Sequence, residues 1–127
     1  MTMYRINPRE NKMELFRSSQ FNMHHYEADL EHWLEQNLHV LTDGEPLLPI
    51  GRQLSNPLSG TLDLLALDAD GNIVVVELKR GKSPRDAIAQ ALEYATWTAG
   101  QTHEDILAQA ERYLYPRTLA QCWAETF

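Results

Sequence analysis

Three ionisable residues interrupt two apolar runs in the middle of the sequence. Asp63 lies within the run 60–67, while Glu77 and Lys79 lie at the end of the run 73–79. A charged group in an apolar strand is costly to bury unless it is paired with opposite charge or bound to a metal. Interruptions of this kind mark functional sites more often than packing solutions. We therefore take Asp63, Glu77 and Lys79 as a candidate chemical centre.

The residue types indicate a site for a divalent cation. Glu77 and Lys79 are two residues apart, so a strand would place them on one face. Two neighbouring carboxylates repel each other, and hard oxygen ligands without a thiolate suit Mg²⁺ or Mn²⁺. Lys79 could orient or help to deprotonate a water, or stabilise charge on a phosphate. The alternative is an ion pair of Lys79 with Asp63 or Glu77 in a half-exposed sheet.

The register of a predicted β-hairpin tests this idea. Two apolar runs joined by the turn sequence 68–72 predict a hairpin. A three-residue loop with Gly71 in the left-handed conformation places Asp63 opposite Glu77. A two-residue Asp-Gly loop would instead place Asp63 opposite Leu78 and separate the carboxylates. The metal hypothesis therefore requires the longer loop or a bulge.

A helix predicted over about residues 24–41 supplies further carboxylates. Its apolar residues recur at helical spacing: Leu30, Trp33, Leu34, Leu38 and Leu41. On a helical wheel Glu27 falls within this stripe, Glu31 at its edge and Glu35 outside it. An inward glutamate could reach the metal site, although Glu27 could equally be a first-turn residue favoured by the helix dipole.

The remaining elements are predicted from local signals. Residues 47–54 form an edge strand because Pro49 and Gly51 weaken the pattern. A helix over 83–99 has Ser83 as N-cap and Pro84 at its first position. Its predicted buried stripe comprises Ala87, Ile88, Ala91, Leu92 and Ala95. Residues 103–115 form a further helix that ends at Pro116. We expect three parts: an N-terminal arm (1–25), a core (26–99) and a C-terminal helical extension (100–127).

Composition limits the class of protein. The chain has 127 residues, a net charge of −7 and one cysteine, Cys122, which suits a single domain without disulfides in a reducing compartment. No apolar run reaches the roughly 18 residues of a membrane helix, so we expect a cytoplasmic protein without a membrane partner. The acidic balance argues against nucleic-acid binding, but one strip is basic: Lys79, Arg80, Lys82 and Arg85.

The ordered set of motifs resembles the PD-(D/E)xK nuclease superfamily. GTLDLL (60–65) and GNIVVVELKRG (71–81) match its D…ExK signature. QALEY (90–94) resembles the QxxxY motif of the RecB-like branch. The similarity is closest to the C-terminal catalytic domain of NucS-type endonucleases, over roughly residues 26–98. An ExK tripeptide alone is common, whereas the whole ordered set is specific.

This resemblance implies an α/β fold with a restriction-endonuclease-like core, in which helices flank a mixed central sheet. It also implies a Mg²⁺- or Mn²⁺-dependent endonuclease that cleaves branched, mismatched or single-stranded DNA, with a role in DNA repair. The alternatives are a non-catalytic nucleic-acid-binding or protein-interaction module on the same fold, and a nuclease acting on RNA.

The resemblance also assigns roles to individual residues. Asp63 and Glu77 would bind the metal with the backbone carbonyl of Leu78, and Lys79 would act on the attacking water. Glu27 would match the helix glutamate of the family, with Glu31 as the competing alignment. The supporting or DNA-binding residues would be Gln90, Tyr94, Arg80, Lys82 and Arg85.

NucS-like proteins also have an N-terminal DNA-binding and dimerisation domain, for which this sequence has no room. We therefore expect a homodimer or a further substrate-binding domain outside this chain.

Overall fold

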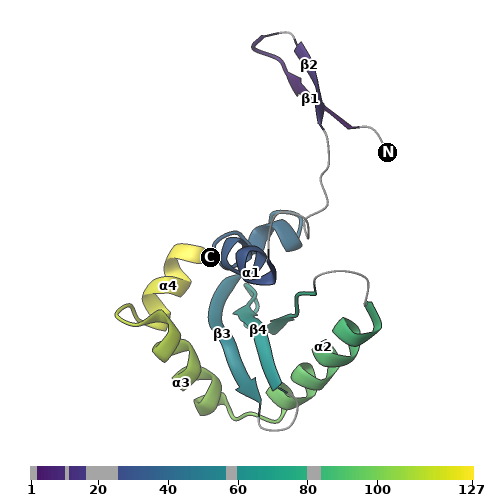
Figure 1. Cartoon of the computed structure of the whole chain (residues 1–127). Helices are drawn as coiled ribbons and strands as arrows, with labels where there is room; N and C mark the ends of the chain where they lie inside the picture. Colours follow the sequence, from purple (N-terminus) through teal and green to yellow (C-terminus); the bar gives the residue numbers. More distant parts are fainter. Residues whose placement is uncertain (1–2, 11, 17–25, 57–59, 80–83) are drawn as a thin grey trace.

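The structure, a computed structural model, describes residues 3–10, 12–16, 26–56, 60–79 and 84–127. Its elements are β1 (Met3–Asn7), β2 (Lys12–Phe16), α1 (Glu27–Glu35), the 3₁₀ helix η2 (Leu38–Leu41), β3 (Leu48–Asn56), β4 (Gly60–Leu67), β5 (Ile73–Val76), α2 (Pro84–Ala99), α3 (His103–Leu114) and α4 (Leu119–Thr126) (Figure 1). β1 and β2 pair with each other in a two-stranded sheet within the predicted N-terminal arm. Among the described residues, no helix is long and apolar enough to cross a bilayer.

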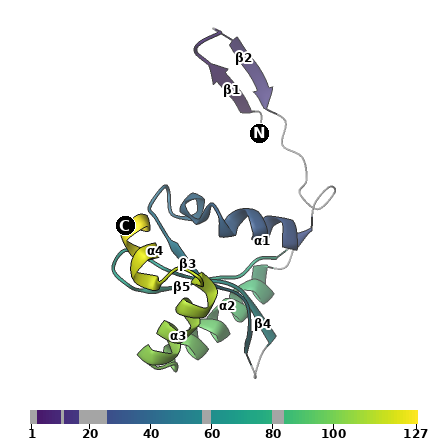
Figure 2. The same ribbon diagram turned by 90° about the vertical axis from the view of Figure 1, so that its left-hand side faces the viewer.

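A three-stranded sheet in the order β3-β4-β5 lies between two layers of helices (Figure 2). On one face, Leu34 and Leu38 pack with Leu64 and Ala66. On the other face, residues from α2, α3 and α4 pack with the sheet: Tyr94, Ala110 and Cys122. The expected α/β class with a sheet flanked by helices is confirmed. Where the resemblance implied a mixed sheet, both strand pairings of this three-stranded sheet are antiparallel.

The β4–β5 hairpin has the predicted register. The Asp68 N–H donates to the Asn72 carbonyl at 3.0 Å, and Gly71 has a φ of 80°. Leu64 pairs with Val76, so continuing the same register places Asp63 opposite Glu77. The three-residue loop that the metal hypothesis required is therefore confirmed.

β3 is an edge strand of this sheet, as predicted. Its pairing with β4 shifts between Pro49 and Gly51, where a residue without an N–H and a residue without a side chain interrupt the strand. This irregularity sets the register of everything that follows in β3.

The predicted helix over 24–41 is too long, because α1 ends at Glu35. The Asn37 side chain donates to the Trp33 carbonyl at 2.9 Å, and such a bond to the preceding turn competes with helix continuation. As a result, two residues of the predicted apolar stripe are substantially exposed: Trp33 at 46% and Leu41 at 49%.

Helix α2 begins at Pro84 as predicted, but its buried face is not the predicted one. Ile88 and Leu92 are 61% and 63% exposed, whereas Tyr94 and Thr98 are 0% and 4% exposed. The alanines of the predicted stripe bury little area, so covering the large ring of Tyr94 outweighs them. The predicted N-cap Ser83 lies outside the described residues.

The C-terminal part is helical. The predicted helix over 103–115 is confirmed as α3, with Thr102 as its N-cap accepting from the Asp105 N–H. Residues 117–127, which the sequence did not assign, contain α4, capped in the same way by Thr118.

Candidate functional site

The Asp63 side chain accepts a hydrogen bond from the backbone just after β5. The sequence predicted a strand over 73–79, but β5 ends at Val76. The Leu78 N–H donates to Asp63 Oδ2 at 2.7 Å, so a side-chain carboxylate accepts the bond that a ladder carbonyl would otherwise receive. The Asp63 carboxylate is thereby fixed beside the segment that carries Glu77 and Lys79.

The pKa values of the two central carboxylates are raised, so their charged forms are disfavoured. Burial raises the pKa of Asp63 above its ordinary value, and the charge of Glu31 raises it further. Burial also raises the pKa of Glu77, and the nearby charge of Asp63 adds to the increase. This is the electrostatic conflict expected from the sequence, and an added positive charge would relieve it.

Glu77 is buried and only partly neutralised. Its side chain is 5% exposed, and Lys79 Nζ lies 3.8 Å from its Oε1 atom. Within the part of the chain that the structure describes, nothing donates a hydrogen bond to the buried Oε2 atom. The Lys79 side chain is 32% exposed, so its ammonium group lies between the buried carboxylate and solvent.

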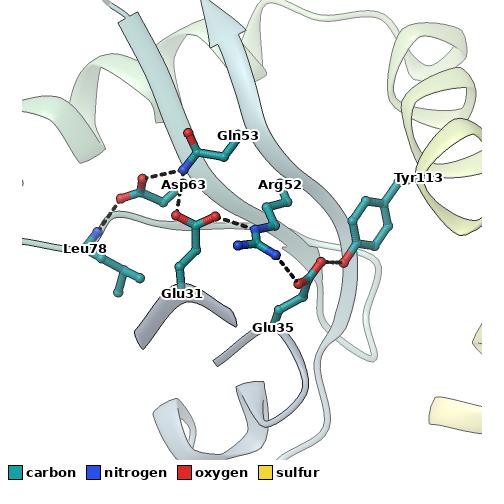
Figure 3. Close-up of polar contacts among 7 residues, drawn as sticks. All are labelled: Glu31, Glu35, Arg52, Gln53, Asp63, Leu78 and Tyr113. Carbon is teal, nitrogen blue, oxygen red and sulfur yellow. Dashed lines mark hydrogen bonds and ion pairs between the residues drawn. The ribbon is translucent and has the colours of Figure 1, made fainter. Parts of the chain in front are cut away.

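Glu31 is the helix carboxylate with the most direct link to Asp63 (Figure 3). It is 5% exposed, and its Oε2 atom accepts from Gln53 Nε2 at 2.6 Å. The same nitrogen donates to Asp63 Oδ1 at 3.2 Å. Glu27, in the first turn of α1, is half-buried, and its charge raises the pKa of both Asp63 and Glu77. Both candidates for the helix glutamate, Glu27 and Glu31, therefore lie close enough to influence the charge of Asp63.

Glu35 was predicted to lie outside the inward face of the helix, and this is wrong. Its side chain is 18% exposed, with Oε2 accepting from Arg52 at 3.0 Å and Oε1 accepting from the Tyr113 hydroxyl. The helical wheel took account of apolar side chains only. It could not predict that Glu31 and Glu35 face the sheet because both form ion pairs with Arg52.

Three residues of this polar cluster were not predicted: Arg52, Gln53 and Tyr113. Arg52 Nε lies 2.5 Å from Glu31 Oε1, so one guanidinium serves two glutamates. A signal was available, because Arg52 is the only Lys or Arg between Glu27 and Asp70 and interrupts a predicted strand. The same reasoning that selected Asp63 would have selected it.

The two residues of the QxxxY motif lie on the sheet-facing side of α2. Tyr94 is fully buried, and burial together with the charges of Glu77 and Asp63 raises its pKa. Gln90 has a buried Oε1 atom without a hydrogen-bond donor among the described residues. Arg85 is exposed in the first turn of α2, whereas Arg80 and Lys82 lie outside the described residues.

The donor set fits a hard divalent cation. Within the described ranges, no three His, Cys, Asp or Glu side chains gather into a ready-made metal cage. Mg²⁺ does not need one, since it is typically held by one or two carboxylates, waters and substrate phosphates. Asp63, Glu77 and the backbone near Leu78 offer such an incomplete set, in which Glu77 Oε2 accepts no hydrogen bond from the residues that the structure describes.

The chain belongs to the family of the endonuclease NucS C-terminal domain. The model of that family matches residues 26–108, which is more than half of the chain and includes every element from α1 to α2. The resemblance noted from the sequence motifs is thereby confirmed.

Individual relatives match over a shorter region. The chain is 35% identical over 68 residues to the endonuclease NucS of Pyrococcus horikoshii, covering 54% of this chain and 26% of that protein. It is 38% identical over 69 residues to that of Pyrococcus abyssi, with coverage of 54% and 26%. The Micrococcus luteus endonuclease NucS is 40% identical over 68 residues, with coverage of 54% and 28%. The chain thus matches about a quarter of the length of these relatives, and no solved structure matches it significantly.

Proposed function

We propose that this chain is a Mg²⁺- or Mn²⁺-dependent deoxyribonuclease that hydrolyses phosphodiester bonds within DNA. Family membership and the name endonuclease carried by its relatives support this proposal. The observation that carries it is the facing pair of Asp63 and Glu77, two carboxylates with raised pKa values and, among the described residues, one oxygen without a hydrogen-bond donor. A fold retained for binding alone has no physical reason to keep this unfavourable pair.

Each residue then has a role that follows from its position. Asp63, Glu77 and the Leu78 carbonyl would hold the cation, which would polarise the phosphate and favour ionisation of a water. Lys79, partly exposed beside Glu77, would orient the attacking water or stabilise charge developing on the phosphate. Glu27 or Glu31 would complete the acidic side, while Gln90 and Tyr94 support it from α2.

DNA would approach along the basic strip. Arg85 is exposed in the first turn of α2, and we propose that it contacts backbone phosphates together with Arg80 and Lys82. Branched, mismatched or single-stranded DNA, as met in DNA repair, is the proposed substrate. Selection among these would depend on a second copy of the chain or on a further domain outside it.

The test compares Asp63→Ala with a control variant, Asp70→Ala. Asp70 is an exposed aspartate of the β4–β5 loop. Cleavage of branched DNA with Mn²⁺ should fall about 1,000-fold in Asp63→Ala, because loss of several kcal/mol of metal assistance costs tenfold per roughly 1.4 kcal/mol. Asp70→Ala should retain wild-type activity and Mn²⁺ affinity by calorimetry.

Undiminished cleavage by Asp63→Ala would disprove the site assignment. A wild-type chain that binds DNA but cleaves neither DNA nor RNA with Mn²⁺ would favour the non-catalytic module. Cleavage of RNA alone would redirect the activity to that substrate.

A further inference from the structure

Two consecutive residues of β3 contact the same carboxylate of α1. Arg52 Nε lies 2.5 Å from Glu31 Oε1, and Gln53 Nε2 lies 2.6 Å from Glu31 Oε2 (Figure 3). Successive side chains of a strand normally point to opposite faces of a sheet. The strand must therefore depart from regular geometry at this point.

The packing of the neighbouring residues locates the departure. Arg52 pairs with Leu64, which packs on the α1 face. Leu54 pairs with Leu62, and both pack on the opposite face. Residues two apart in a regular strand share a face. The side chains of β3 and β4 therefore both change face between these two pairs. That level is occupied by Gln53 and, opposite it in the register, Asp63.

The backbone of Gln53 makes this reversal possible. Its φ is 50°, in the left-handed region that side chains other than Asn, Asp and Gly rarely adopt. Conformations of this kind are unfavourable, persist only when the surroundings enforce them, and concentrate at functional sites. A regular strand would point Gln53 away from the face that Arg52 occupies.

The result is a neutral bridge between two carboxylates. The Gln53 amide nitrogen donates to Glu31 Oε2 at 2.6 Å and to Asp63 Oδ1 at 3.2 Å. Since Leu78 donates to Oδ2 at 2.7 Å, both Asp63 oxygens already accept one hydrogen bond. Each oxygen has a further lone pair, so the carboxylate is oriented without being blocked.

We propose that Gln53 is a positioning residue of this site: it fixes the orientation of Asp63 for a cation and couples it to Glu31. Arg52 supports this role by compensating the charges of Glu31 and Glu35. The inference deepens the proposed nuclease function and rests on it.

Two variants separate the amide from the backbone. Gln53→Gly adopts a left-handed φ without cost but has no amide, whereas Gln53→Ala lacks the amide and keeps the backbone strain of the wild type. If the amide positions Asp63, both variants should lose about 10- to 100-fold in Mn²⁺ affinity and in kcat, as for other residues that orient metal ligands. KM for DNA should stay near the wild-type value, and Gln53→Gly should melt at a higher temperature than Gln53→Ala.

A role confined to backbone shape gives a different result. Both variants would then keep wild-type Mn²⁺ affinity and kcat, because the wild type already carries the strain that Gln53→Ala retains. That outcome would overturn the positioning role while leaving the nuclease function intact.

A metal-free measurement distinguishes this failure from failure of the proposed function. In ¹⁵N-labelled protein without metal, the side-chain NH₂ resonances of Gln53 should shift in Glu31→Gln and in Asp63→Asn but not in Asp70→Asn. Resonances that respond to neither carboxylate would overturn the bridge. A wild-type chain that binds no Mn²⁺, even with an oligonucleotide present, would overturn the positioning role together with the nuclease function.

Discussion

The two halves of the three-stranded sheet follow different rules. In the half formed by residues 64–67 and 73–76, side chains alternate regularly: Leu64 and Ala66 pack on the α1 face, and Leu65 and Leu67 on the other. At the level of Gln53 and Asp63 the alternation breaks, and hydrogen bonds between polar side chains replace apolar packing. The first half is specified by hydrophobic pattern and the second by polar contacts around a strained residue, so the apolar packing and the proposed site are largely separated.

The largest effect should come from breaking the apolar half. Leu65 is 1% exposed, and Leu65→Ala should lower the free energy of unfolding by about 2–5 kcal/mol, the usual cost of such a cavity. Urea denaturation would measure it, with the 36% exposed Ile73 changed to alanine as the control. If the halves are separate, the folded fraction of Leu65→Ala should bind Mn²⁺ with wild-type affinity, and a parallel loss of affinity would contradict the comparison.

A smaller effect is expected from the helix carboxylates on the polar side. Glu31→Gln removes the negative charge beside Arg52 and replaces one of the two oxygens that accept from Arg52 and Gln53 with an NH₂ group. It should reduce kcat for DNA cleavage by about 10- to 100-fold. Glu27→Gln should have the weaker effect, because Glu27 acts on Asp63 less strongly than Glu31 does. Steady-state cleavage kinetics of both variants decide the order, and a greater loss in Glu27→Gln would assign the helix glutamate to Glu27.

The smallest effect concerns pH. In the metal-free protein the pKa of Asp63 is raised above its ordinary value of 3.8, so the unfolded state releases its proton first as pH rises. The stability contributed by the protonated form is fully present below that value and is lost as pH rises through the raised pKa. Asp63→Asn should therefore lose less stability than wild type between pH 4 and pH 8 in EDTA.

Urea denaturation across this pH range checks the expectation. If the free energy of unfolding changes equally with pH in the two proteins, ionisation of Asp63 does not destabilise the fold. Added Mn²⁺ should stabilise the wild type at pH 8 and leave Asp63→Asn unchanged.

The features predictable from the sequence are those set by local chemistry. The register of the β4–β5 hairpin depends on the turn 68–72, where the Asp68 carboxylate accepts from the backbone N–H groups of Asp70 and Asn72 and Gly71 supplies a positive φ. These interactions lie within five residues, so the sequence alone specifies them. The same locality explains why the start of α2 at Pro84 was predicted correctly.

The features that could not be predicted depend on contacts between residues that are far apart in the sequence. The buried face of α2 was wrongly assigned because Ile88 and Leu92 outweigh Tyr94 in a pattern of apolar residues, although Tyr94 is the one that is buried in the core. The reversal at Gln53 arises from contacts with α1, 17 to 22 residues away in sequence for the bonds concerned. No signal in the strand sequence marks a glutamine that will adopt a left-handed φ.

The change of face in β3 restricts which residues can occupy position 51, which is a glycine in this chain. A Cβ atom at this position would lie 2.6 Å from Leu54 Cδ1 and 3.2 Å from Gln109 Nε2, because the reversal brings residue 54 onto the face of residue 51. A side chain at position 51 therefore requires the Leu54 side chain to move, position 54 to become smaller or the strand to straighten. In the evolution of this domain, positions 51 and 54 should covary, although neither of them belongs to the polar cluster.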